Sequence, residues 1–367
     1  GAIVLTVSVM GYLYDVSGER LLVIAAWGAL IGGIVQVVIQ LPAVLEVLTH
    51  FRFSLGKAVF GVQEAINTFI PVAMARGVVN ISALLEVILA ALLAEGAVAA
   101  LGYAQTLYLL PISIFGLSIA AAELPELSRQ RLAAPKVLKA KIEKALESIY
   151  FWVMPSTIGF LVFGGTIIAG IYQRGEFLST DVPVVYGVLA AYSLGLIASS
   201  ASRVLSTGFY ALRDTKTPAR VAYIRVILSL SIGFLLMFPF DEIQSGNLHY
   251  GPVGLALGTS VAAWVEYWML RYHLKSNLGS SLSEIKDLAR IFSGSCMAAV
   301  IGYVVQVFVK MGFNDLMPNE GFFGSLEQPI TAAIVILSFG LSYLILMDLF
   351  GVGWSISRWL RTLKEVS

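Results

Sequence analysis

The stretch LLVIAAWGALIGGIVQVVIQLP, residues 21–42, contains no charged residue over 22 positions. A helix needs about 20 consecutive apolar residues to cross the hydrocarbon core of a membrane, because each residue advances the helix by ~1.5 Å. Backbone polar groups in lipid must be satisfied within the segment, which favours a helix over any other conformation. This stretch therefore predicts a transmembrane helix.

The composition of the whole chain extends this prediction to the other segments. Of 367 residues, 58% are hydrophobic and 13% are charged, and the mean hydropathy is +0.84. An ordinary soluble domain has about 45–50% apolar and about 25% charged residues. A soluble globular fold is thereby excluded, and we expect an all-α polytopic membrane protein.

Apolar runs bounded by charge, Pro or Gly predict about ten transmembrane helices. Their expected limits are 1–14, 21–42, 66–93, 97–122, 146–172, 184–211, 219–240, 252–270, 290–309 and 329–350. The first run is shorter than a full span, so we expect the chain to begin inside a helix and to lack its natural N-terminus. The longest expected connections are 43–61, 129–144, 271–290 and 310–328.

Lys and Arg are distributed unevenly over these connections. Alternate connections and the C-terminal tail hold 18 of the 24 basic residues, the opposite set holds 3, and the remaining 3 lie inside predicted helices. Cytoplasmic loops of membrane proteins carry an excess of Lys and Arg. The pattern predicts a cytoplasmic C-terminus and, with ten spans, a cytoplasmic N-terminal end.

Several kinds of site are not expected from the sequence. Cys296 is the only cysteine, which excludes a disulfide framework and a cysteine metal cluster. His50, His249 and His273 lack a second ligand at metal-binding spacing, so we expect neither a metal nor a cofactor. With a net charge of +1, the chain lacks the strong positive electrostatic field that attracts nucleic acid. The sequence contains no nucleophile or phosphate-binding motif, so we expect no catalytic residue and no enzymatic activity.

The third predicted helix carries the strongest candidate residues. Arg76 and Glu86 are ten positions apart, ~15 Å along a helix, and Asn80 lies one turn beyond Arg76. A charge inside the bilayer is costly unless it faces water or a partner. The favoured interpretation is a cavity in which Arg76 meets an anionic group and Glu86 is its counter-charge or a proton or cation site. A structural ion pair with a neighbouring helix is the alternative.

Two further arginines lie inside predicted helices. Arg203 falls in a run of small polar residues that suits a wet inner wall, although snorkelling to the interface explains it equally well. For Arg225, two turns past Pro218, snorkelling is the favoured interpretation. The run around Arg203 comprises Ser199, Ser200, Ser202, Ser206 and Thr207.

The first turns of the 97–122 helix offer hydrogen-bonding groups without charge, namely Tyr103, Gln105, Thr106 and Tyr108. An aromatic belt at the membrane interface explains the two tyrosines almost as well. Prolines inside helices bend the axis, and either a hinge or a static kink fits Pro71, Pro111 and Pro155. Glycines four residues apart, at 28 and 32 and at 254 and 258, predict close helix packing.

Two stretches of the chain resemble signatures of the MurJ (MviN) lipid II flippases. These are GYAQTLYLLPISIFGLSIAAAELPELSR, residues 102–129, and the more specific GFYALRDTKTPARVA, residues 208–222. The helix with Asn80 and Glu86 is also similar to one in that family. The motif positions are Pro111, Gly208, Asp214, Lys216, Thr217 and Pro218.

The resemblance implies the exporter-type fold of the multidrug/oligosaccharidyl-lipid/polysaccharide exporter superfamily, which has two six-helix lobes around a central cavity. The chain would hold the last ten of the family's fourteen helices, with an incomplete first lobe. Residues 1–61 would form the end of that lobe and a cytoplasmic connection, residues 62–272 the second lobe, and residues 273–367 two additional helices and a cytoplasmic tail.

The function that the resemblance implies is movement of the undecaprenyl-pyrophosphate-linked peptidoglycan precursor from the inner to the outer leaflet by alternating access. The implied location is the bacterial inner membrane. The implied partners are this lipid, membrane lipids and proteins of cell-wall synthesis, so that the chain would contribute to cell-wall formation and cell shape.

One departure from the family pattern affects the candidate site. Many members have an acid, an arginine and a second acid where this chain has Gln105, Thr106 and Leu109. We hypothesise that Arg76 supplies the missing positive charge. Two alternatives remain open: an exporter of drugs or of another polyprenyl-linked saccharide, and a non-transporting membrane scaffold. A positive cavity would favour a pyrophosphate carrier, and an acidic cavity would favour a drug exporter.

Overall fold

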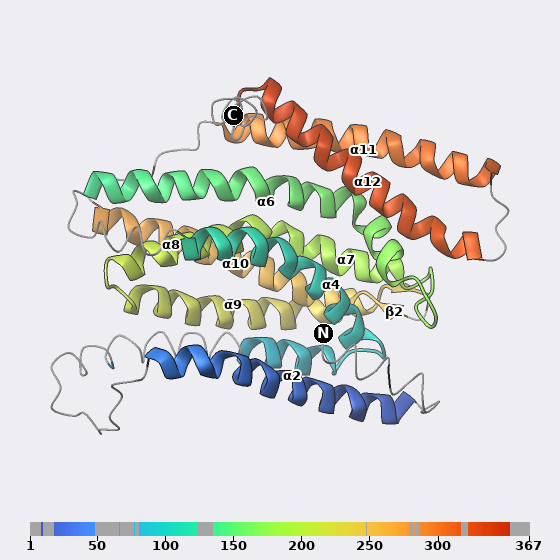
Figure 1. Cartoon of the computed structure of the whole chain (residues 1–367), viewed down its shortest axis with the longest axis horizontal. Coiled ribbons are helices and arrows are strands. Elements are labelled where there is room, and N and C mark those ends of the chain that lie inside the picture. The colour runs from blue at the N-terminus through green and yellow to red at the C-terminus, as the bar shows by residue number, and fades with distance from the viewer. Residues whose placement is uncertain are drawn as a thin grey trace. The chain divides into compact units, whose positions relative to one another are not determined.

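A computed structural model of the chain describes residues 9, 18–47, 66, 77, 81–122, 135–246, 248–278, 282, 287–316 and 322–352. The chain divides into two compact units, Gly1–Gln63 and Glu64–Ser367. The described helix of the first unit is α2 (Gly18–Val47), which contains the uncharged stretch 21–42 (Figure 1). Most of its large apolar side chains are exposed, as expected for a helix surrounded by lipid.

In its described residues, the second unit is a bundle of long helices with a β-hairpin of two short strands. A short helix covers residues 81–90, and β1 (Gln244–Ser245) pairs antiparallel with β2 (Leu248–His249). The other elements are α4 (Ala97–Pro111), the π-helix η1 (Ile112–Leu117), α6 (Pro135–Tyr172), α7 (Val182–Leu194), α8 (Leu196–Ala211), α9 (Lys216–Asp241), α10 (Gly251–Leu278), α11 (Leu288–Leu316) and α12 (Phe322–Leu349).

Within the described residues, eight helical segments are long and apolar enough to cross a membrane. They correspond to eight of the ten expected spans, and the all-α polytopic fold is confirmed. The expected span 1–14 lies outside the described residues except for Val9. Of the expected span 66–93, the structure describes residues 66, 77 and 81–93, and the helix there ends at Ala90.

Several helices extend beyond their expected ends. The expected start of a helix at 146 is wrong, because α6 begins at Pro135 and includes most of the basic connection. Leu138 and Ile142 are buried in the bundle, so these first turns are amphipathic rather than apolar. Helices α10 and α11 also run several residues beyond their apolar runs. Hydropathy marks only the part of a helix that lies in hydrocarbon, whereas hydrated helix ends carry polar side chains.

Two expected helices are interrupted. The helix expected at 184–211 consists of α7 and α8, which are separated at Gly195. In the helix expected at 97–122, Pro111 ends α4 and the π-helix η1 follows. Proline lacks the N–H that would continue the helical ladder, which gives a physical reason for the second interruption.

Helices α9 and α10 pack closely along each other. A Cβ atom added to Gly254 would lie 2.6 Å from the backbone carbon of Leu236, and one added to Gly258 would lie 2.5 Å from the backbone nitrogen of Gly233. This confirms the close packing predicted for Gly254 and Gly258. Helices α11 and α12 pack on each other and on α6.

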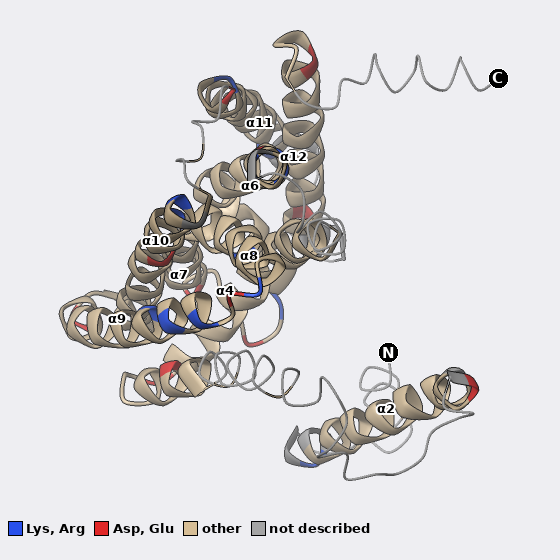
Figure 2. Cartoon of the chain, turned by 90° about the vertical axis from the view of Figure 1, so that its left-hand side faces the viewer, with Lys and Arg blue, Asp and Glu red and all other residues tan. Residues whose placement is uncertain are grey.

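Basic residues gather at one end of the second unit. The start of α6, the end of α8, the start of α9 and the end of α10 lie at that end, on the left of Figure 1. Figure 2 faces this end and shows Lys and Arg on several of these helix ends. Connections that the Lys and Arg pattern assigns to one side of the membrane therefore also lie at one end of the bundle.

Candidate functional site

Glu86 lies on the helix 81–90 and is partly buried in the second unit. Its Oε1 accepts a hydrogen bond from the Tyr192 hydroxyl at 2.7 Å and another from the Thr259 hydroxyl at 3.1 Å. Arg76 and Asn80 lie outside the described residues, so the expected cavity, in which Arg76 meets an anionic group and Glu86 is its counter-charge or a proton or cation site, stays a prediction. The contacts of Glu86 in the structure come from α7 and α10.

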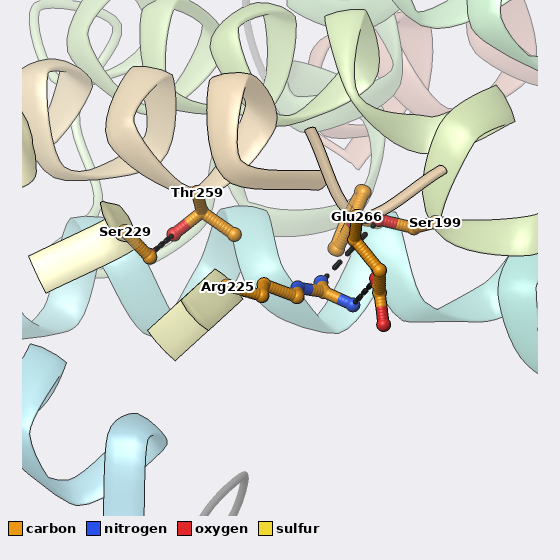
Figure 3. A network of polar contacts seen from close by, with 6 residues as sticks. Ser199, Arg225, Ser229, Thr259 and Glu266 are labelled. Atoms are coloured by element: carbon orange, nitrogen blue, oxygen red, sulfur yellow. Dashed lines mark hydrogen bonds and ion pairs between the residues drawn. The ribbon is translucent and has the colours of Figure 1, made fainter. Parts of the chain in front are cut away.

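Arg225 on α9 forms an ion pair with Glu266 on α10. The Arg225 Nη1 atom lies 2.6 Å from Glu266 Oε2, and Nη2 lies 3.5 Å from the Ser199 hydroxyl (Figure 3). The two charged side chains are only 24% and 11% exposed. The expectation that Arg225 snorkels to the interface is therefore wrong. A carboxylate on the adjacent helix pairs the guanidinium inside the bundle, so it does not need to reach water.

Hydroxyl groups and two stacked rings connect Glu86 with this ion pair. The Tyr108 hydroxyl donates to Ser199 Oγ at 2.9 Å, and the rings of Tyr108 and Tyr192 stack with centroids 4.9 Å apart. Ser229 and Thr259 share a hydrogen bond of 3.0 Å (Figure 3). We call the whole set the polar network; it comprises Glu86, Tyr108, Tyr192, Ser199, Arg225, Ser229, Thr259 and Glu266.

Six helices contribute to the polar network, and helical periodicity explains how. Arg225 and Ser229 are four residues apart on α9, which places both on one face. Thr259 and Glu266 are seven residues apart on α10, again on one face. The close packing of α9 on α10 brings these two faces together. The network is thus built from side chains far apart in sequence.

The charges of the polar network are two carboxylates and one guanidinium. Buried charges must be paired or hydrogen-bonded, because hydrocarbon offers them no solvation. Glu266 is paired with Arg225, whereas the contacts just described for Glu86 are with hydroxyls. A carboxylate whose partners are hydroxyl groups can take up a proton or bind a cation. Its hydrogen bonds to these hydroxyl groups can also be replaced by others without breaking a covalent bond.

The other predicted candidates lie in varied surroundings. Arg203 is partly buried on α8, one turn after Ser199, and its carbonyl accepts the Thr207 hydroxyl at 2.9 Å. Tyr103 is 37% exposed and packs on Tyr172 with ring centroids 4.7 Å apart.

Helix α4 contributes Tyr108 to the polar network, but the three positions that depart from the family pattern have different surroundings. Gln105 is partly buried. The Thr106 hydroxyl donates to the Gly102 carbonyl of its own helix at 2.9 Å. Leu109 is 43% exposed. None of these three side chains carries a charge.

The motif between α8 and α9 forms a capped turn. Arg213 has φ of 60°, and the next N–H, of Asp214, bonds back to the Phe209 carbonyl at 2.9 Å, which closes α8. The Asp214 carboxylate accepts the Thr217 N–H at 3.0 Å and the Thr217 hydroxyl at 2.6 Å. This contact satisfies an N–H at the start of α9.

Of the remaining motif residues, Lys216 and Pro218 belong to the same turn, whereas Gly208 and Pro111 lie in other helices. Pro218 is buried in the first turn of α9, and Lys216 is exposed at its start. Gly208 allows close approach, because an added Cβ would lie 2.8 Å from Ile142 Cδ1. Pro111 is buried where α4 ends. The described contacts of Asp214 and Thr217 therefore give this motif a structural role in joining two helices.

Several residues of the polar network were missed by the sequence analysis. Glu266 is an acid inside an apolar span, so the rule that selected Arg76 could have selected it. Tyr192, Ser229 and Thr259 give no such signal, because tyrosine and small hydroxyl residues are common in membrane helices. Only their contacts distinguish them.

Comparison with known proteins gives consistent matches. The family model described as "Lipid II flippase MurJ" matches residues 2–326. A probable lipid II flippase MurJ of Vibrio cholerae is 27% identical over 89% of this chain and 59% of its own length. One of Rhizobium tropici is 29% identical over 86% of this chain and 58% of its own length. The chain thus spans less than two thirds of these relatives.

A solved structure has the same fold. The structure titled "Lipid II flippase MurJ, inward closed conformation" matches with a TM-score of 0.68 and 22% sequence identity. The match covers 95% of this chain and 66% of that one. At this identity the comparison shows the fold alone.

Proposed function

Because the chain belongs to the lipid II flippase MurJ family, we propose that the protein containing it moves lipid II, the undecaprenyl-pyrophosphate-linked peptidoglycan precursor, from the inner to the outer leaflet. The observation that carries this proposal is the family match over residues 2–326. The proposed location is the bacterial inner membrane, and the proposed role is in cell-wall synthesis, with cell-wall synthesis proteins as partners.

The polar network supports a transport role over a scaffold role. A bundle that only holds other proteins has little reason to keep two carboxylates and a guanidinium among apolar helices, since each charge is costly there. In alternating access, two arrangements of a bundle expose a site to opposite sides in turn. Hydroxyl and ion-pair contacts between helices can exchange during such a cycle, and no bond of the substrate is made or broken.

The proposed organisation follows the family. Residues 1–61 would be the last two helices and connection of the first lobe, residues 62–272 the second lobe, and residues 273–367 two additional helices and the tail. The end of the bundle that gathers Lys and Arg (Figure 2) would face the cytoplasm. The C-terminus is proposed to lie in the cytoplasm as well, from the basic residues of the tail.

The proposed substrate cavity includes the residues selected from the sequence. These are Arg76, Asn80, Glu86, Tyr103, Gln105, Thr106 and Arg203. Arg76 is proposed to supply the charge that is missing at position 106. Replacing Arg76 by Ala in the full-length protein should strongly reduce transport of lipid II, and unimpaired transport would contradict this role.

The proposed function can be tested with purified full-length protein in vesicles that contain fluorescent lipid II in one leaflet. We expect protein-dependent movement to the other leaflet, and growth of a bacterium depleted of its own flippase when the protein is supplied. Movement of other polyprenyl-linked saccharides or drugs, but not lipid II, would favour the exporter alternative. Movement of none of them would favour a scaffold.

A further inference from the structure

The break between α7 and α8 lies in the middle of one membrane span. In a continuous helix the Gly195 N–H would bond to the carbonyl of Ala191, four residues earlier. It bonds instead to the Tyr192 carbonyl at 3.0 Å. The regular ladder resumes when the Ser199 N–H bonds to the Gly195 carbonyl at 2.9 Å.

Side chains of α10 bind the carbonyls around the break. The Ser260 hydroxyl donates to the Ala191 carbonyl at 2.6 Å, and the Trp264 indole N–H donates to the Leu194 carbonyl at 2.8 Å. Ser260 and Trp264 are one turn apart, so both lie on the α10 face toward the break. Carbonyls freed within a membrane must find such partners, because lipid offers none.

Gly195 allows α10 to approach this closely. A Cβ atom at position 195 would lie 2.7 Å from the Ser260 Cα atom and 2.8 Å from its hydroxyl oxygen. The Ser260 side chain is 3% exposed and has little room to move away. The break therefore depends on close packing of Gly195 against α10 and on the hydrogen bonds of Ser260 and Trp264.

The break also determines which side chains meet in the polar network. Tyr192, three residues before Gly195, donates to Glu86. Ser199, four residues after Gly195, contacts Tyr108 and Arg225. Because the two segments meet at the break, a rotation of α8 relative to α7 there would move Ser199 relative to Tyr192. Discontinuous helices near the bilayer midplane form the substrate and coupling-ion sites of many transporters.

We propose that Ser260 and Trp264 are positioning residues that hold α7 and α8 in the broken arrangement. Release of their bonds would let the Gly195 N–H return to Ala191 and let α8 turn relative to α7. The contacts of Tyr192 with Glu86 and of Ser199 with Arg225 then change together in the transport cycle. This inference rests on the proposed function for its link to transport.

The first test compares three variants in the vesicle assay. Ser260→Ala and Trp264→Phe each remove one donor and should slow lipid II movement by about 3–10-fold, the effect of one hydrogen bond. Ser193→Ala is the matched control, because its fully buried hydroxyl donates to the Leu189 carbonyl of its own helix at 2.7 Å. The control should stay within about twofold of the parent rate. Equal effects of all three variants would contradict the proposal.

A second test separates positioning from simple packing. Gly195→Ala should clash with Ser260, and adding Ser260→Gly removes the hydroxyl oxygen and the Cβ atom from this clash but leaves the Cα atom at 2.7 Å. We expect the double variant to recover part of its melting temperature but to transport slowly. Recovery of both properties would overturn the proposal, because packing alone would then explain the site.

A third measurement does not depend on transport. Hydrogen exchange of the amides in 195–199, measured in detergent without substrate, should be about tenfold faster in Ser260→Ala and Trp264→Phe than in Ser193→Ala, because each passage between the broken and the continuous arrangement breaks hydrogen bonds of these amides. Unchanged exchange in the first two variants would overturn the proposal. A parent protein that moves no lipid would contradict the proposed function, while this exchange measurement would still decide whether α10 holds the break.

Discussion

The guanidinium of Arg225 lies 2.6 Å from the carboxylate of Glu266, across two helices whose backbones nearly touch. The pair links α9 and α10 at low exposure, and its Ser199 contact extends it toward α8. A buried pair of this kind contributes little when compared with an apolar replacement, but a single remaining partner is strongly destabilising. Single and double replacements of the pair should therefore differ in their effect on stability, and this difference can be measured.

Glu266→Gln should destabilise the protein by about 3 kcal/mol, because it leaves the Arg225 guanidinium buried without its carboxylate. Thermal unfolding of the purified protein in detergent measures this effect. The control is Asp287→Asn, since Asp287 pairs with Arg290 at 3.0 Å beside the start of α11, and these side chains are 41% and 62% exposed. Its cost should stay below about 1 kcal/mol. Equal losses of unfolding free energy in the two variants would show that the buried pair contributes no more to stability than the exposed pair.

Replacing both partners, as Arg225→Met with Glu266→Met, should restore most of the stability lost in Glu266→Gln, because no unpaired charge remains. Transport should nevertheless stay low if the charges take part in the cycle. The same preparations serve for unfolding and vesicle measurements. A double variant that is stable and fully active would limit the pair to a structural role.

Tyr192→Phe should slow transport by about tenfold, because it removes the hydroxyl that donates to Glu86 and keeps the ring that stacks on Tyr108. Rates are normalised to the amount of folded protein. Tyr186→Phe on the same helix is the control, because the Tyr186 hydroxyl donates to the Leu161 carbonyl at 2.6 Å, outside the polar network. If both variants slow transport equally, loss of the hydrogen bond to Glu86 does not explain the effect of Tyr192→Phe.

Gly254→Ala should lower stability by about 1–3 kcal/mol, because the new methyl group would meet the backbone of α9 at Leu236. Gly340→Ala on α12 meets no atom within 4 Å and should be neutral or stabilising by up to about 1 kcal/mol. Unfolding in detergent compares the two. A neutral Gly254→Ala would mean that α9 and α10 separate easily.

Asp214→Ala should destabilise the protein by about 1 kcal/mol, because the Thr217 N–H at the start of α9 loses its acceptor. Asp214→Asn keeps an acceptor oxygen in place and should lose less. The melting temperatures of both variants measure the difference. An Asn variant as unstable as the Ala variant would point to the charge rather than the hydrogen bond.

The orientation predicted from Lys and Arg can be tested by labelling. In a Cys296→Ser background, an impermeant maleimide added to intact cells should label Glu176→Cys and not Lys216→Cys. Glu176 is exposed in the turn between α6 and α7, and Lys216 is exposed at the basic end of the bundle. The reverse labelling pattern would place the C-terminus outside the cytoplasm.

Much of the fold could be predicted from the sequence, and the reason is the solvent. In lipid, an uncharged run such as 21–42 must be helical, and its length is fixed by the thickness of the hydrocarbon. Helix ends such as the start of α6 at Pro135 were harder to predict, because hydrated helical turns carry polar side chains and cannot be told from loops by hydropathy. The polar network was predicted only in part, through Glu86 and the hydrogen-bonding groups of Tyr108 and Ser199.

Hydropathy, charge and motifs along the chain are enough to identify these segments as membrane helices, to find the basic residues on alternate connections, and to recognise the resemblance to one flippase family. The folded bundle is needed to see which polar groups meet: Arg225 pairs with Glu266, Tyr192 and Thr259 bind Glu86, and Ser260 binds a carbonyl at the break. Solvation of apolar side chains is a property of each segment and can be read along the chain. The partner of a buried polar group depends on which helix faces meet, and that is set by packing among all the helices at once.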